Sequence, residues 1–496
     1  MKTSPRALAA VALLAGFPLL VVVLVAGIVT VEVYALFHSP IWALAFGVIA
    51  VPSLGVLLKT VLILGRPPRE EPGLRVLPEE QPELWNLVRE LADEIGRRAP
   101  DRIFLTADAN AGVLHENHLF RPSQRQLLLG ALLLSAFRLD QLRAVLAHEL
   151  THYDHGQWSR AATYRWHRSL SRTVLGLDHA RGLDWFVRPL LQSYAKAYFA
   201  VSARVRRDAE FAADLGAVRL AGTAAAVSAL RESEGLAEAW GFFLDNYAAE
   251  GWAAGYFPAR LAEGYRALLA DDWRKREIAD VRKTLAKRKT ARFDHHPATP
   301  ERIAALETAP AVAPPAGGDG PAYQILRDAE EFLDTALLTG LVDEVSTKER
   351  TDWDTLAGLG AHHTALGNAL GVLGGRTLGD ALDMIDTGEA TPLAAPGFTV
   401  PAGAAPEVRR AMVGAAIRRR LSLVVTAALA DAGVVRWRVS WSGPAEIVVD
   451  GPGNEAVSAA LDAACTADPD TTPLRVLLKE AEVPLDYRPS RSTALG

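Results

Sequence analysis

The stretch Ala147–Gly156 reads A-H-E-L-T-H-Y-D-H-G, and the rest of the chain is interpreted from it. His148 and His152 are four residues apart, which on an α-helix places both imidazoles on one face, one turn apart. Two such imidazoles suit a single tetrahedral zinc ion. Glu149 follows the first histidine and is well placed to take a proton from a metal-bound water. The stretch predicts half of a hydrolytic zinc site, with a third ligand elsewhere.

The residues around this stretch predict the helix that the spacing requires. Asp140 can cap the N-terminus of this helix, and Gly156 can end it at the C-terminus. Between them, four apolar residues give the helix a buried side: Leu142, Val145, Leu146 and Leu150. The alternative is a chance match, in which the histidines are ordinary polar residues of a helix.

Length, charge and cysteine content limit the classes of protein. A chain of 496 residues has room for two or three domains. Its net charge of -5 gives no argument for a nucleic-acid partner, and we expect none. Cys465 is the only cysteine, so neither an intrachain disulfide nor a cysteine-based metal site is expected. A single cysteine fits a reducing compartment.

Two apolar segments, at residues 7–31 and 41–64, lie near the N-terminus. Each is long enough to cross a bilayer, which takes about 20 residues. A cleaved signal peptide is the alternative for the first segment, but that segment is too long for a simple signal core and a second one follows at once. We therefore expect residues 1–66 to form a membrane hairpin.

The basic residues around this hairpin predict its orientation. Lys2 and Arg6 precede the first segment. Lys59, Arg66 and Arg69 lie at or after the end of the second, and the loop between the two segments has no Lys or Arg. By the positive-inside rule both ends lie in the cytoplasm. We expect the histidine motif to face the cytoplasm as well.

Between the hairpin and the histidine motif, the pattern predicts a mixture of helix and strand. The predicted elements are a tether at 67–78, a helix at 82–98, a short strand at 102–106, a turn at 108–112 and a strand leading into a helix at 126–134. A strand beside the metal helix would suit a peptidase, because an extended peptide can add to an exposed sheet edge. A plain core strand is the alternative.

The third ligand is predicted from R-R-D-A-E-F-A-A-D, residues Arg206–Asp214. Glu210 and Asp214 are four apart and share one helical face. A second helix would thus offer a carboxylate, leaving the fourth position of a catalytic zinc for water. Asp214 would then accept a hydrogen bond from a ligating histidine. The alternative is a solvated acidic face. Just before it, residues 185–201 predict an amphipathic helix rather than a third span.

The motif H-E-L-T-H, followed by E-F-A-A-D in an arginine-rich helix, resembles the membrane-associated zinc metallopeptidases of family 48, the HtpX-like and CAAX-prenyl-protease-like group. Those proteins share an N-terminal hydrophobic hairpin, an HExxH helix and a later ExxxD helix. The resemblance implies His148, His152 and Glu210 as zinc ligands, Glu149 as general base and Asp214 as the partner of a ligand.

A further segment supports the resemblance. His296-Pro297, then Glu301-Arg302-Ile303, is similar to the HPxxxER segment of the family. The resemblance implies that His296 lies near the zinc and that Arg302 lies near the substrate or transition state. A helix cap followed by an amphipathic turn is the alternative for His296. The family often carries an N-A-F-type segment before its edge strand. Here Asn110-Ala111 is followed by a glycine instead, which is a departure from the family pattern.

The C-terminal third has a different composition. Residues 308–322 are rich in proline and glycine and predict a linker. Beyond it, residues 323–496 predict helices and then an α/β region, with strands at 434–441, 446–449 and 474–478. No catalytic constellation is evident there. We expect an accessory module that binds a protein partner.

Together these patterns predict an α+β, mainly helical fold: the hairpin, a zincin-like metallopeptidase domain at 67–307, the linker and the accessory module. The predicted function is a membrane endopeptidase with one Zn2+ per chain, two spans and a cytoplasmic catalytic domain. Its partners would be unfolded or membrane polypeptides and the lipid bilayer. The alternatives are a non-catalytic, zinc-stabilised membrane scaffold and a zinc amidase acting on small molecules.

Overall fold

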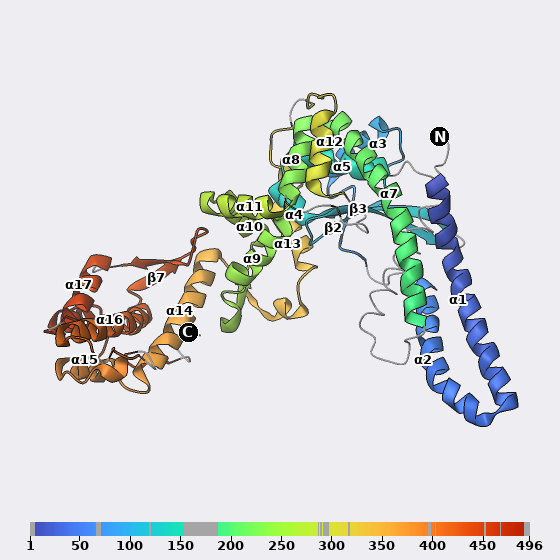
Figure 1. The fold of residues 1–496 in the computed structure, drawn as a ribbon. Coiled ribbons are helices and arrows are strands. Elements are labelled where there is room, and N and C mark those ends of the chain that lie inside the picture. The colour runs from blue at the N-terminus through green and yellow to red at the C-terminus, as the bar shows by residue number, and fades with distance from the viewer. Residues whose placement is uncertain are drawn as a thin grey trace. The chain divides into compact units, whose positions relative to one another are not determined.

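The computed structural model is mainly helical with a few short strands, as the sequence predicts (Figure 1). It describes residues 5–65, 71–118, 121–152, 187–285, 287, 290, 297–315, 318–394, 398–401, 403–450, 453–466 and 468–490. The chain divides into two compact units. Unit 1 comprises Met1–Ala237 and Ile278–Gly340, and unit 2 comprises Glu238–Glu277 and Leu341–Gly496.

The N-terminal part of unit 1 is a helical hairpin. Helix α1 spans Pro5–His38 and α2 spans Pro40–Gly65, and the two pack against each other. Among the described residues, the segment Ala12–His38 is long and apolar enough to cross a membrane, and Pro40–Gly55 is a shorter apolar helix. Ser39 alone separates the two helices, since α1 ends at His38 and α2 begins at Pro40.

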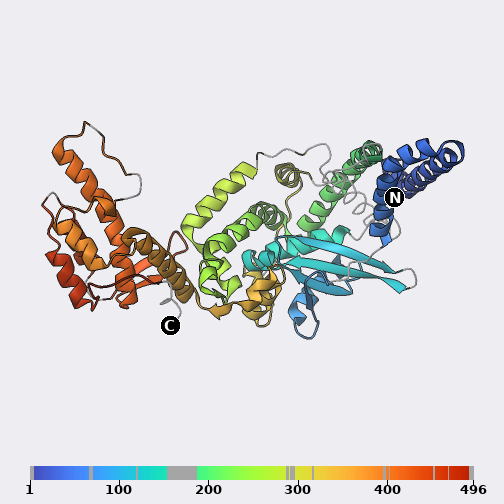
Figure 2. The same ribbon diagram turned by 90° about the horizontal axis from the view of Figure 1, so that it is seen from below.

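A four-stranded sheet forms the layer on which helices of unit 1 pack (Figure 2). Its strands are β1 (Leu74–Val76), β2 (Arg102–Thr106), β3 (Ala111–His118) and β4 (Arg121–Gly130), in the order β1-β2-β4-β3. Strands β2 and β4 are parallel, and β1 and β3 are antiparallel edges. The sequence predicts β2 and β4, but it places β1 inside the tether and the start of β3 in a turn.

The other helices of unit 1 pack against this sheet or against one another. They are α3 (Pro82–Glu94), α4 (Ala131–Ala136), α5 (Leu139–Thr151), α7 (Val187–Ala221), α8 (Thr223–Ser233), α12 (Thr299–Thr308) and α13 (Ala329–Leu338). The predictions of α3 and of a strand leading directly into α4 agree with these bounds. Helix α5, whose last turn carries His148, packs against α7, α8 and β3.

The segment predicted as a linker is part of unit 1. The backbone amides of Leu139 and Asp140, at the start of α5, donate to the carbonyls of Gly320 and Gly318. The amide of Ala322 donates to Phe137 in the same way. These bonds satisfy amides at a helix start that would otherwise lack partners. The unit therefore continues past the predicted boundary at residue 307, up to Gly340.

Unit 2 is also mainly helical. Its helices are α9 (Leu236–Phe243), α10 (Leu261–Ala270), α11 (Asp272–Leu285, shared with unit 1), α14 (Trp353–Leu373), α15 (Leu378–Asp386), α16 (Pro406–Asp431), α17 (Asn454–Ala464) and α18 (Thr472–Glu480). Its strand pairs are β5 (Tyr256–Pro258) with β6 (Glu349–Thr351), and β7 (Val435–Arg438) with β8 (Glu446–Val449).

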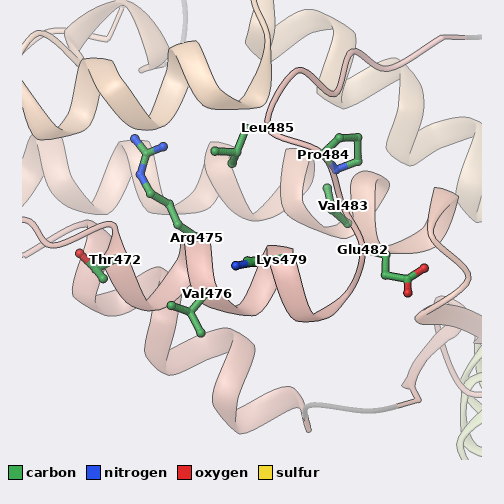
Figure 3. Close-up of a pocket in the computed structure, with 8 residues that line it drawn as sticks. All are labelled: Thr472, Arg475, Val476, Lys479, Glu482, Val483, Pro484 and Leu485. Carbon is green, nitrogen blue, oxygen red and sulfur yellow. The ribbon is translucent and has the colours of Figure 1, made fainter.

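The predicted strand at 474–478 is wrong, because these residues belong to α18. Pro473 stands in the first turn of the helix, and Leu474, Leu477 and Leu478 are buried at helical spacing. A groove of about 520 Å³ lies along α18. Figure 3 shows the side chains that line it, which include Val476, Leu485 and the charged Arg475. The C-terminal region is thus a helical bundle with a small β-hairpin.

Candidate metal centre

The histidine motif forms the last turn of α5. The helix buries Leu142, Leu146 and Leu150, as the apolar spacing predicts. Its N-cap is Arg138, whose amide donates to the Gln141 side chain at 2.8 Å, so the start lies two residues before the predicted cap. His152 follows the last helical residue and keeps right-handed helical dihedrals. The two imidazoles are therefore held one turn apart on one face.

The second helix of the centre is α7. Glu210 and Asp214 lie one turn apart on it, and both are buried, with 6% and 2% exposed. Ala213 and Ala217 are buried beside them. Small residues allow the two backbones to approach closely: a Cβ on Gly216 would lie 2.3 Å from Oγ1 of Thr151 on α5. This close approach brings the carboxylates of α7 to the imidazoles of α5.

Three donor atoms converge at this contact. Nε2 of His148 lies 3.1 Å from Nε2 of His152 and 3.4 Å from Oε2 of Glu210, and Nε2 of His152 lies 3.5 Å from Oε1 of Glu210. Ligand atoms about 2.1 Å from a tetrahedral zinc ion are separated from one another by about 3.4 Å. The donor set and its separations fit zinc, with two nitrogens and one carboxylate leaving a fourth position open.

A second layer of residues holds the first. Nδ1 of His148 lies 3.0 Å from Oδ1 of Asp214, the geometry of an N–H donating to a carboxylate. Nε of Arg302, on α12, donates to Oδ2 of Asp214 at 2.8 Å, and its Nη2 donates to Oδ1. A proton fixed on Nδ1 leaves Nε2 of His148 free to coordinate a metal. Asp214 is thus placed where the sequence predicts it.

Burial and the charges of neighbouring side chains shift the pKa values of His148 and Asp214. Burial alone lowers the pKa of His148, but the hydrogen bonds with Asp214 and Glu210 outweigh it and raise this pKa to about 9. Burial raises the pKa of Asp214, yet its bonds with Arg302 and His148 hold that pKa below the usual value. In the metal-free protein the negative field of the carboxylates therefore favours a cation at this point, and a proton occupies it when no metal does.

The remaining predicted residues are placed as follows. Glu149 is half-buried on α5, and its charge raises the pKa of both His148 and Arg302, so it lies within electrostatic reach of both. Arg302 also reaches the site, and Nη2 lies 4.0 Å from Oε2 of Glu210. Because its guanidinium is bonded to Asp214, the geometry gives Arg302 a positioning task. His296 lies outside the described residues, as do residues 153–186.

The edge strand β3 lies against α5. Its first four residues are partly exposed, and a Cβ added to Gly112 would meet nothing within 4 Å. Within the described residues, β3 pairs only with β4, so its other edge has no strand partner there. Sequence reasoning missed one element of the centre, Gly216. The only signal for it was a glycine inside a predicted helix, two residues after Asp214.

Comparison with known proteins agrees with this geometry. Residues 78–309 match the family model described as peptidase family M48. The matched segment includes α5, α7 and α12, which carry the converging residues. No curated protein and no solved structure matches the chain.

Proposed function

We propose that the chain is a member of peptidase family M48, whose family model matches residues 78–309, and that it is a membrane-anchored, zinc-dependent endopeptidase. One observation carries the proposal: the ligand atoms of His148, His152 and Glu210, from two helices far apart in the chain, lie within 3.1–3.5 Å of one another. These three residues would hold one Zn2+ ion. When bound, the ion would supply Lewis acidity to water and to the scissile carbonyl.

The protein's own side chains would do the remaining work. Glu149 would take the proton from the attacking water and pass it to the leaving amine. Asp214 would keep the Nδ1 proton of His148 in place, so that the imidazole presents Nε2 to the metal. Arg302 would hold the Asp214 carboxylate in that orientation through its two N–H bonds. The substrate would bind as an extended strand along the edge of β3.

The hairpin supplies the location. We propose that α1 and α2 both span the membrane, with the peptidase unit in the cytoplasm, as the distribution of Lys and Arg predicts. The substrates would be unfolded or membrane polypeptides, which suits a role in the quality control of membrane proteins. Unit 2 would serve as an accessory module that binds a protein partner.

The test is a Glu149→Gln variant of the full chain, purified in detergent. This variant should keep one zinc per chain and lose cleavage of an unfolded protein such as casein by at least about 100-fold, because general-base catalysis contributes about 10²–10⁴-fold. The measurements are the metal content and the rate of fluorescent peptide release. Unchanged turnover would exclude Glu149 as the base. Zinc without cleavage in the wild-type protein would favour the non-catalytic scaffold.

A further inference from the structure

Helix α16 begins outside the apolar core of unit 2. The residues from Ala405 to Ala411 are all exposed, and the first buried residue of the helix is Gly414. Pro406 and Glu407 stand in the first turn, where both favour a helix start, and alanines with high helix propensity follow. The first two turns of α16 are therefore favoured by their own sequence and remain open to solvent.

The outward face of α16 carries an apolar stripe that ends in an arginine. Its members are Val408, Met412, Ala415 and Arg419. At about 100° per residue these four side chains fall within a sector of about 60°. That sector lies opposite the residues by which this part of the helix packs onto unit 2, which are Gly414, Ile417 and Leu421. Val408 is 52% exposed and Ala415 is exposed, so the stripe faces solvent.

Positive charge accompanies this stripe. Residues 408–430 contain five arginines and no Asp or Glu. Arg418 pairs with Asp462 on α17, and Nη2 of Arg420 donates to the carbonyl of Gly371 at 3.0 Å. The other three are exposed or end the stripe, and no carboxylate within the described residues pairs with them: Arg409, Arg410 and Arg419. The outward face of α16 is therefore a helical surface with uncompensated guanidinium groups.

The composition of this face favours a protein partner over a lipid surface. Helices that lie in a membrane interface insert Trp, Phe or Leu side chains, and the stripe contains none of these. Arg and Met are enriched at protein interfaces, and Arg is frequent among the side chains that contribute most to binding. The small side chain of Ala415 also allows the close approach of a second helix.

We propose that the outward face of α16 binds an acidic amphipathic helix of a protein partner. Apolar side chains of that helix cover Val408 and Met412, and its carboxylates pair with Arg409 and Arg419, which lie about 15 Å apart at a rise of about 1.5 Å per residue. The inference rests on the proposed role of unit 2 as a partner-binding module. It does not depend on the peptidase activity.

The test uses the full chain in detergent and two fluorescein-labelled helical peptides of about 20 residues, a length that allows several helical turns. The first peptide has a Leu stripe flanked by Glu, and the second has Lys in place of every Glu. Fluorescence anisotropy should show that the Glu peptide binds at least about 10-fold more tightly, because like charges across an interface oppose binding. A Glu peptide that binds no better than the Lys peptide would overturn the proposal.

Charge reversal locates the binding surface. The double variant Arg409→Glu with Arg419→Glu should lose the Glu peptide and gain the Lys peptide, and a gain of binding cannot result from misfolding. The matched control is Arg438→Glu, since Arg438 is an exposed arginine of unit 2 on β7. The control should keep the wild-type preference. A double variant that still prefers the Glu peptide, or a control that reverses its preference, would exclude α16 as the surface.

Anionic lipid is the alternative partner, and a polarity-sensitive dye tests it. The dye is attached at Ala411→Cys in a Cys465→Ser background, because Cys465 is the only cysteine of the chain. With the full chain in nanodiscs, dye emission should not respond to phosphatidylserine. A blue shift with phosphatidylserine would overturn the proposal in favour of lipid. Casein cleavage is measured in parallel: peptide binding without cleavage would refute the peptidase alone, and cleavage without peptide binding would refute the α16 surface alone.

Discussion

Arg302 in unit 1 and Arg274 in unit 2, whose side chains are 13% and 11% exposed, show how differently the units use polar groups. Arg302 in unit 1 forks onto Asp214, a carboxylate with 3% of its side chain exposed, which in turn lies 3.0 Å from Nδ1 of His148. Arg274 in unit 2 donates to the hydroxyl of Tyr247 at 2.9 Å and to the carbonyl of Trp441 at 2.8 Å. The first arginine holds a carboxylate that itself contacts an imidazole. The second pairs with the carboxylate of Glu277, which is half exposed, and otherwise satisfies neutral groups at the border of an aromatic cluster.

The difference indicates which unit is built to bind an ion. Around His148, lone pairs from two helices converge on one point at 3.1–3.5 Å. Around Arg274, aromatic rings surround the polar groups: the ring centroids of Tyr247 and Trp441 are 5.2 Å apart. Converging lone pairs repel one another unless a cation or a proton lies between them. Unit 1 therefore contains a site for a cation, and the polar groups of unit 2 stabilise its core.

The largest expected effect comes from the third ligand. Glu210→Gln removes the anionic oxygen that faces both imidazoles, and it should weaken zinc binding by more than about 100-fold, the upper range for loss of a partner outside the ligand set. Casein cleavage should fall below detection. Isothermal titration with zinc measures the first quantity. The matched control is Glu277→Gln, since Glu277 also pairs with a buried arginine but lies in unit 2, away from the centre. Equal zinc affinity in both variants would remove the distinction between the units.

A smaller effect is expected from the carboxylate behind His148. Asp214→Asn keeps the shape of the side chain but weakens the bond that fixes the imidazole, so zinc affinity should fall about 10–100-fold. Asp431 provides the control, because it also accepts from a histidine, with Oδ1 2.8 Å from Nε2 of His362, but in unit 2. Asp431→Asn should leave zinc affinity unchanged. A loss of less than twofold in Asp214→Asn would show that Asp214 does not position His148.

The ligand residues were predictable because the chemistry imposes a local spacing. Both His148–His152 and Glu210–Asp214 are pairs four residues apart, and each pair indicates a helix face by itself. The contact between the two faces depends on tertiary packing, because 57 residues separate His152 from Glu210. The sequence also predicted helices within residues 323–496, where α14 and α16 lie.

Three other features depend on contacts with residues distant in the chain, so the local sequence pattern did not predict them. The three residues of β1 become a strand only because β2 offers them an edge. Residues 308–322 have the composition of a linker, yet the amides at the start of α5 require acceptors and find them there. The segment at 474–478 is too short for its periodicity to separate strand from helix, and the buried face of α18 decides the outcome.

The close contact of the two helices should be sensitive to one methyl group. Gly216→Ala would place its Cβ 2.3 Å from Oγ1 of Thr151, so α5 and α7 must separate. Overpacking of this kind costs about 1–3 kcal/mol, and part of this cost should be seen as weaker zinc binding. Thermal unfolding with and without zinc measures both. The double variant Gly216→Ala with Thr151→Ala removes the clashing atoms and should recover most of the loss. A double variant no better than the single one would exclude this contact as the cause.

The smallest expected effect tests a titrating group in unit 2. Burial raises the pKa of Glu250 from 4.5 to about 7, whereas in the unfolded chain the carboxyl keeps its ordinary value. The folded state therefore binds this proton more tightly, and the resulting stability is complete below about pH 4.5 and lost as the pH rises to about 7. Glu250→Gln cannot ionise, so above pH 7 it should be more stable than the wild type by about 1–2 kcal/mol, a value reduced for the partial exposure of the side chain. Urea unfolding of both proteins at pH 4.5 and pH 8, followed by tryptophan fluorescence, should show the gain at pH 8 alone. A gain of the same size at both pH values would mean that the charge of Glu250 is not its cause, whereas a change in zinc affinity would contradict the separation of roles between the two units.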